Sequence, residues 1–131
     1  MSDLKEILAQ TVFRQIPGNY IYAKLKSVPD NPREHFLVSF DEDEVTVVTK
    51  VENYEKLKAV ERNKDQYALI ELRVSIPFYS VGFLASVSTA IASKSMNVLI
   101  VSTYSKDYIL IKTDKTHLAK ESLEELGMKE A

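Results

Sequence analysis

The 131-residue sequence predicts an α+β fold in which helices cover one face of an antiparallel sheet. Two observations predict it. Short runs of alternating apolar and polar residues, rich in branched side chains, are typical of strands. Two longer segments, at 82–94 and 114–127, instead repeat apolar residues at helical spacing. Because both kinds of segment are mixed along the chain, we expect sheet and helices to share a core.

The composition limits the class of protein. Apolar residues make up 45% of the chain and charged residues 27%, the balance of a soluble globular domain. The net charge of -2 gives no electrostatic footprint for nucleic acid or an anionic membrane. The absence of cysteine excludes disulfides, thiolate metal sites and a cysteine nucleophile. The N-terminus is unlike a secretory signal and no apolar run is long enough to span a bilayer, so we expect a cytoplasmic protein.

The first half of the chain is expected to be mostly strands. Pro17 and Gly18 interrupt the apolar pattern and predict a turn. Acidic residues at 41–44 favour a solvated link between two strands. Asn53 is a candidate helix cap before a narrow apolar stripe. In order, we expect a short helix at 4–8, strands at 19–28, 35–40 and 44–51, and a helix at 52–65 carrying Tyr54, Leu57 and Val60 on one face.

The second half reads strand, helix, strand, strand, helix. Pro77 ends the first strand, and Gly127 fits the end of the last helix, for which Asp114 and Thr116 are candidate caps. The expected elements are strands at 67–75, 97–104 and 107–113, and helices at 82–94 and 114–127.

That order is the ferredoxin-like pattern without its last strand. A sheet that lacks an edge strand is expected to recruit one from the rest of the chain. The sequence therefore predicts two interlocked units, 1–66 and 67–131, within one compact domain.

Two segments carry a family resemblance. "SVGFLASVSTAIA" (80–92) followed by "VSTYSKDYILI" (101–111) resembles the ACT domain family, in particular a small stand-alone branch in which a degenerate ACT-like half precedes a better-formed one. The cytosolic arginine sensors of animal cells resemble the same branch. The layout matches over 12–128, and the specific motifs lie within 80–111. The resemblance implies a non-catalytic, allosteric regulator or sensor that binds a free amino acid or similar metabolite, without a cofactor.

The start of the predicted helix is one side of a candidate ligand site. Gly82 opens the helix directly after a strand and has no side chain to keep a ligand from the backbone. Amide groups of Gly82, Phe83 and Leu84 can receive a carboxylate, which the helix dipole favours. Ser80 and Val81 precede them and complete this side of the site.

The link between the last two strands is the other side. Ser102, Thr103 and Tyr104 end one strand, and Asp107 begins the next. Asp107 could hold the amine or a basic side chain of an amino acid. In the arginine sensors an acid at the matching position contacts the ligand.

The chain departs from the resemblance at two positions. Ser95 stands where this branch usually has glycine, so the helix must end at a less permissive residue. Many relatives carry His-Asp-His where this chain has Lys106, Asp107 and Tyr108. The identity of the ligand is therefore left open.

Each candidate residue also has a structural interpretation. Gly82 suits a strand-to-helix turn, Ser102 and Thr103 can satisfy backbone groups, and Asp107 can pair with Lys106 on the surface. Phe83 and Leu84 are expected in the core.

Three other classes of function compete with ligand binding. An RNA-binding module would need exposed aromatic residues with a basic motif, which the strands lack. An enzyme would need a nucleophile or base with an orienting partner, and His35 and His117 are expected to be solvated. A ligand-free dimerisation module is the main alternative. Pairing is compatible with ligand binding, and we expect a homodimer.

Overall fold

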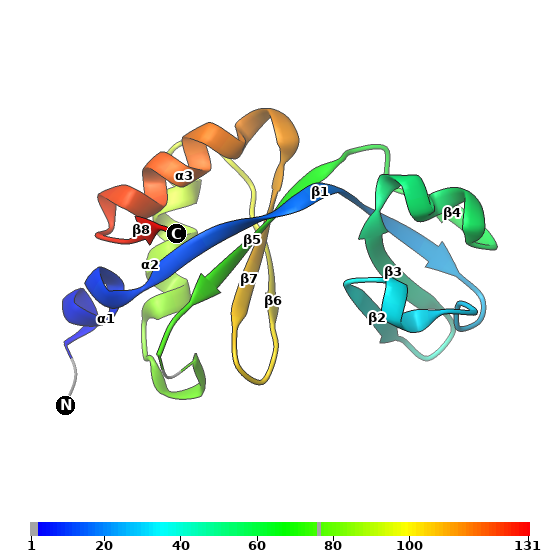
Figure 1. The fold of residues 1–131 in the computed structure, drawn as a ribbon, viewed down its shortest axis with the longest axis horizontal. Coiled ribbons are helices and arrows are strands. Elements are labelled where there is room, and N and C mark those ends of the chain that lie inside the picture. The colour runs from blue at the N-terminus through cyan, green and yellow to red at the C-terminus, as the bar shows by residue number, and fades with distance from the viewer. Residues whose placement is uncertain (1–2, 76) are drawn as a thin grey trace. The chain divides into compact units, whose positions relative to one another are not determined.

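The computed structural model describes residues 3–75 and 77–131, which form two compact units. Unit 1 contains 1–17 and 68–131, and unit 2 contains 18–67. Strand β1 runs through the boundary (Figure 1). The helices are α1 (Leu4–Gln10), α2 (Phe83–Ala92) and α3 (Thr116–Glu125); the strands are β1 (Val12–Leu25), β2 (Leu37–Phe40), β3 (Val45–Lys50), β4 (Ala59–Arg62), β5 (Tyr67–Arg73), β6 (Leu99–Ser102), β7 (Asp107–Lys112) and β8 (Lys129–Glu130).

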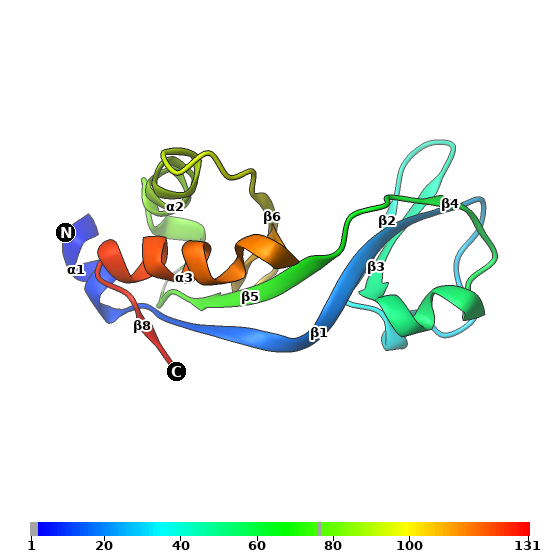
Figure 2. The same cartoon turned by 90° about the horizontal axis from the view of Figure 1, so that it is seen from above.

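Unit 1 is a sheet covered by helices on one face. Its strands follow the order β1–β5–β7–β6, with β6 and β7 antiparallel. Helices α2 and α3 lie on the same side of β5 and the first part of β1 (Figure 2). This is the helix-on-sheet arrangement that the sequence predicts, and the α+β assignment is confirmed.

The core of unit 1 joins these elements. Helix α2 buries Phe83, Val87 and Ile91, at the spacing of one helical face. The N-terminal segment contributes as well, because Ile7 and Phe13 belong to the same cluster. The remaining buried members are Leu8, Ile70, Leu72, Val74, Met96, Ile109, Ile111, Ala119, Leu123 and Met128.

Unit 2 is a smaller sheet. β3 pairs with β2 on one side and with β1 on the other, both antiparallel, and β4 pairs with β1. Its core is formed by Ala23, Leu25, Val45 and Val47. Side chains of Val38, Tyr54, Leu57 and Ala59 pack against this cluster.

The turn predicted at Pro17 and Gly18 is wrong. β1 continues through both residues, and Gly18 takes a left-handed conformation with φ 112° within the strand. Both residues are exposed and lie where the two units divide. A proline and a glycine, which usually interrupt strands, are tolerated at these two positions of β1 because neither side chain belongs to a hydrophobic core.

The helix predicted at 52–65 is also wrong. The segment forms a 3-10 turn at Val51–Lys56 and then strand β4. Asn53 does not cap a helix, because its side-chain amide donates to the Thr49 hydroxyl. Tyr54 and Leu57 pack on the core as the stripe predicts, but Val60 is 51% exposed. Pairing with β1 therefore outweighs the weak helical pattern.

The chain does add a strand after Gly127, contrary to the prediction. β8 pairs in parallel with the start of β1, and the amide of Lys129 donates to the Thr11 carbonyl at 3.3 Å. β8 has only two residues and neither is apolar, so the sequence contains no alternating pattern from which this strand could be predicted.

The sequence predicted how α2 and α3 end, but not how α3 begins. Gly127 ends α3 at φ 110°, as predicted. Ser95 follows α2 at φ 62°, the less permissive ending that the sequence indicated. The predicted caps of α3 are absent from the described hydrogen bonds: the Thr116 hydroxyl donates to the Thr113 carbonyl instead. No helix of the described residues is long and apolar enough to cross a membrane.

Candidate functional site

Helix α2 begins at a glycine in the left-handed conformation. Gly82 has φ 85°, and its carbonyl accepts from the Ser86 amide at 2.9 Å. The first amides of any α-helix have no acceptor within the helix. One of them is already satisfied here, because the Phe83 amide donates to the Ser80 carbonyl at 3.1 Å. A ligand carboxylate at this end would therefore use other amides of the turn.

The need for glycine at position 82 has a structural explanation. A side chain is strained at this φ, and a Cβ atom would lie 3.3 Å from the Cδ2 atom of Leu4. The backbone conformation and the nearby Leu4 side chain are thus enough to explain why position 82 is glycine, without a ligand close to the backbone. A large substitution at Gly82 would disturb α1 as well as any site.

The link between β6 and β7 is a tight turn that fixes the next candidate residues. The Thr103 amide donates to the Lys106 carbonyl at 2.8 Å, and the Thr103 hydroxyl donates to the same carbonyl at 3.1 Å. Thr103 therefore serves the turn, as its structural interpretation predicts. Ser102 and Asp107 form the last register pair before the turn.

Asp107 is buried on the helix-covered face of the sheet. It lies two residues before the core residue Ile109, so strand alternation places both side chains on one face. Asp107 is only 2% exposed. Its Oδ1 atom accepts from the Ser102 hydroxyl at 2.6 Å, whereas Oδ2 is buried and has no hydrogen-bond partner among the described residues. Leaving a buried carboxylate oxygen unsatisfied costs free energy, about 1–3 kcal/mol or more.

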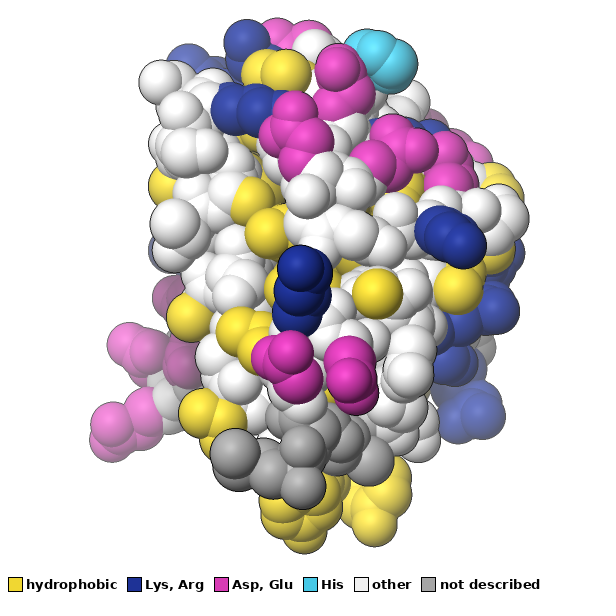
Figure 3. Space-filling model, turned by 90° about the vertical axis from the view of Figure 1, so that its left-hand side faces the viewer, with side chains coloured by type: hydrophobic (Ala, Val, Ile, Leu, Met, Phe, Trp, Pro, Cys, Tyr) yellow, Lys and Arg dark blue, Asp and Glu magenta, His cyan; other side chains and the backbone are white. Residues whose placement is uncertain are grey.

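An aromatic contact joins the two sides of the candidate site. The rings of Phe78, before α2, and Tyr104, in the β6–β7 turn, have centroids 5.2 Å apart at an interplanar angle of 78°. Phe78 is 60% exposed and Tyr104 is 83% exposed. Figure 3 shows hydrophobic side chains exposed at the lower edge of the face that it draws. Phe78 did not stand out in the sequence, although it lies between a strand and a glycine-initiated helix.

The remaining candidates differ in their surroundings. Val81 is 90% exposed, whereas Phe83 is buried in the core, as expected. Leu84 is half-buried and packs against the same core. The segment before α2 and the β6–β7 turn thus lie at one end of unit 1, with Val81 open to solvent.

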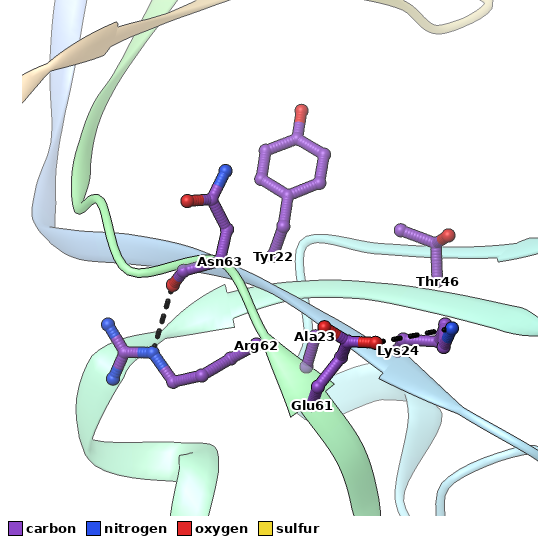
Figure 4. Close-up of a pocket in the computed structure, with 7 residues that line it drawn as sticks. All are labelled: Tyr22, Ala23, Lys24, Thr46, Glu61, Arg62 and Asn63. Atoms are coloured by element: carbon purple, nitrogen blue, oxygen red, sulfur yellow. Dashed lines mark hydrogen bonds and ion pairs between the residues drawn. The ribbon is translucent and has the colours of Figure 1, made fainter.

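A separate cavity of about 270 Å³ lies in unit 2. Figure 4 shows Tyr22 and Asn63 pointing to the same side of it, with Lys24 paired to Glu61 below them. The Lys24–Glu61 distance is 3.3 Å, and the Asn63 amide donates to the Tyr67 hydroxyl at 3.2 Å. Burial, and to a lesser degree neighbouring Tyr67, raises the pKa of Tyr22, which stays protonated at neutral pH. The polar groups here are largely paired with one another.

The two histidines lie in different surroundings. His117 is 92% exposed, as predicted. His35 is half-buried instead of solvated, and its Nδ1 atom lies 2.8 Å from the Thr49 hydroxyl. Within 3–75 and 77–131, no three histidine or acidic residues gather as metal ligands would.

Comparison with known proteins finds one family model that is similar to part of the chain. The ACT domain family model matches residues 63–125. No curated protein matches the sequence significantly.

Solved structures share the fold at low sequence identity. VC0802 from Vibrio cholerae, described as a protein of unknown function and possible transport protein, has a TM-score of 0.81 at 20% identity, over 95% of both chains. Protein Atu0741 from Agrobacterium tumefaciens has a TM-score of 0.74 at 17% identity, over 92% of both chains. The regulatory subunit of aspartate kinase from Thermus thermophilus, in a ligand-free form, has a TM-score of 0.61 at 13% identity, over 88% of this chain and 95% of that one. Residues 63–125, which hold β5, α2, β6, β7 and α3 in ferredoxin-like order, thus match the ACT domain family model, and the solved structures share the fold.

Proposed function

We propose that this protein is a non-catalytic regulatory module that binds a free amino acid or a close analogue. The proposed site lies between residues 80–84 and 102–107. The observation that carries the proposal is the buried Asp107 carboxylate, whose Oδ2 atom has no hydrogen-bond partner within the part of the chain that the structure describes. An ammonium group would satisfy this oxygen with a charge-assisted hydrogen bond.

The start of α2 would hold the other charged end of the ligand. An α-amino acid carries a carboxylate beside its ammonium group, and a helix N-terminus attracts anions. The left-handed Gly82 starts this helix next to the exposed Val81. The Phe78–Tyr104 contact supports a common site, because it ties the segment before α2 to the β6–β7 turn.

A regulatory role is supported by the comparisons. Residues 63–125 match the ACT domain family, and similar folds include the regulatory subunit of aspartate kinase. Under this proposal the ligand changes how the protein associates with a target, and no chemical step takes place. The proposed location is the cytoplasm, where free amino acids are abundant.

A thermal-shift screen of the twenty common amino acids tests the proposal. A ligand that binds only the folded protein raises its melting temperature, by an amount that grows with ligand concentration. We expect one amino acid, or a small related group, to do so. If none raises the melting temperature at millimolar concentration, free amino acids are not the ligand.

Ligand-free pairing of two copies is the second candidate function. It is favoured by exposed side chains of Phe78, Tyr79, Val81 and Tyr104, which would lose unfavourable contact with water in an interface. Sedimentation at micromolar concentration measures the association directly. A homodimer that forms equally with and without amino acids would favour this role, whereas a monomer under all conditions would contradict it.

A further inference from the structure

The sheet face of unit 1 opposite the helices carries an unusual set of charges. Along β5, Ile70 and Leu72 belong to the helix-covered core. Because strand residues alternate between faces, Glu71 and Arg73 lie on the opposite face. Glu71 is nevertheless only 3% exposed, so other side chains cover its carboxylate.

Neighbouring strands bring two more polar side chains to this face. Arg14 follows the core residue Phe13 in β1, and Tyr108 precedes the core residue Ile109 in β7. Alternation therefore places Arg14 and Tyr108 on the same side as Glu71. We call Arg14, Glu71, Arg73, Lys106 and Tyr108 the sheet-face cluster.

Glu71 holds two guanidinium groups in place. The Nε group of Arg73 donates to Glu71 Oε1, and an Nη atom of Arg14 lies 3.6 Å from Glu71 Oε2. The side chains of Arg14 and Arg73 remain 45% and 49% exposed. Each guanidinium has five N–H donors, and a single carboxylate cannot use all of them. Donors therefore remain on the solvent side.

The sheet-face cluster carries more positive than negative charge. Burial by itself raises the pKa of Glu71, but the hydrogen bond and charge of Arg73, with the charges of Lys106 and Arg14, outweigh it and lower that pKa. Glu71 is thus ionised at neutral pH beside three cations, which leaves a net charge of +2. Burial, followed by the charge of Glu71, raises the pKa of Tyr108, so this phenol keeps its proton.

We propose that the sheet-face cluster binds a phosphate group, either as inorganic phosphate or on a small phosphorylated metabolite. The two guanidiniums, positioned by Glu71, would contact phosphate oxygens, and Lys106 would add charge. Phosphate suits the donors in geometry, because Arg binds phosphate with paired N–H groups. It also nearly balances the excess positive charge of the cluster, because the dianion carries up to two negative charges. The chain as a whole has a net charge of -2, so a general attraction for anions does not explain binding at this face.

An NMR titration of the whole protein with inorganic phosphate tests the inference. The ionic strength is held constant with sodium chloride, so that only a specific anion effect is seen. We expect saturable shifts at the amides of Arg14, Glu71, Arg73 and Tyr108. A parallel titration with a phosphorylated sugar separates the two sources: a tighter affinity for the sugar would assign the site to a metabolite, and an equal affinity would assign it to free phosphate. A proportional, non-saturating response would contradict the proposal.

Three variants distinguish phosphate binding at the sheet-face cluster from a general effect of the protein's net charge. Arg14→Gln is expected to weaken phosphate binding by about tenfold, the effect of one lost charge-assisted contact. Arg33→Gln makes the same change of charge at an exposed position in unit 2 and should leave the affinity unchanged. Glu71→Gln keeps an acceptor oxygen for the guanidiniums but removes the one negative charge of the cluster, so it should strengthen phosphate binding.

Several outcomes would overturn the inference. Equal weakening by Arg14→Gln and Arg33→Gln would show that net charge alone is responsible. Concentration-dependent shifts at the cluster without phosphate would show that it meets a second copy of the chain instead. Neither result depends on amino-acid binding at residues 80–84 and 102–107, so the two proposals fail separately.

Discussion

The Ser102 hydroxyl donates a hydrogen bond of 2.6 Å to Asp107, its register partner across the β6–β7 hairpin. This bond satisfies one oxygen of a carboxylate that is almost fully buried, and the other oxygen is left without a partner among the described residues. The hairpin thus holds Asp107 in a state that a cationic ligand group would stabilise.

Substitution of Ser102 tests this relationship. Ser102→Ala removes a donor from a buried carboxylate, so we expect the free energy of unfolding to fall by about 1–3 kcal/mol. Ser105→Ala, at an exposed position in the same turn, should change stability by less than about 0.5 kcal/mol. Denaturant unfolding measures both. Equal effects would mean that the Ser102–Asp107 bond contributes nothing.

The end of α2 offers a stabilising change. Ser95 is exposed at φ 62°, a conformation that glycine adopts without a steric penalty. Ser95→Gly should raise the free energy of unfolding by about 1 kcal/mol. Ser93→Gly, two residues earlier at φ -64°, should lower it by a similar amount. A loss of stability in Ser95→Gly would show that the serine is not strained.

The N-terminal segment should be essential to unit 1. Phe13 is completely buried in the core that contains α2 and α3, so Phe13→Ala should lower the free energy of unfolding by about 3–5 kcal/mol. The polypeptide 68–131 without the first 17 residues should not unfold cooperatively. Phe40→Ala, at a position 67% exposed, is the control and should have little effect. A cooperative, soluble 68–131 monomer would contradict this view of the fold.

Glu71 should make stability depend on pH. Its folded-state pKa lies below the ordinary value of 4.5, so its contribution is fully present above pH 4.5 and is lost as the pH falls through the folded pKa. The stability advantage of the parent protein over Glu71→Gln should therefore shrink as the pH falls below about 4.5. Glu55→Gln, at an exposed position, should show no such trend. A constant difference between parent and Glu71→Gln would exclude the ion pairs as its source.

The order of β5, α2, β6, β7 and α3 could be predicted because each has a strong periodic pattern. The apolar spacing of α2 and the branched residues of β5 need no distant information. The region around Pro17 and the segment 52–65 could not be predicted in the same way. Part of 52–65 pairs with β1 as strand β4, and β1 runs on through Pro17 and Gly18 to pair with β3 from Tyr20 onward. Strand pairing thus overrides the local signals of proline, glycine and a narrow helical stripe.

The candidate site was only partly visible in the sequence. Gly82 and Asp107 stand out by residue type and position. The structure adds that Leu4 lies close to where a side chain at position 82 would begin, and that the Ser102 hydroxyl donates a hydrogen bond to Asp107. The exposed ring of Phe78 and the pairing of Arg14 with Glu71 escaped prediction. Each depends on a contact between residues far apart in the chain, which no local pattern reveals.

The most direct test of amino-acid binding is an NMR titration of the parent protein and Asp107→Asn with the amino acid that gives the largest thermal shift. In the parent, shift changes should be concentrated at residues 80–84 and 102–107. In Asp107→Asn the affinity should fall about tenfold or more, because one charge-assisted contact is lost. Asp114→Asn, at an exposed position, should bind as the parent does. Unchanged affinity in Asp107→Asn, or shift changes centred on the Figure 4 cavity instead, would contradict the proposed site.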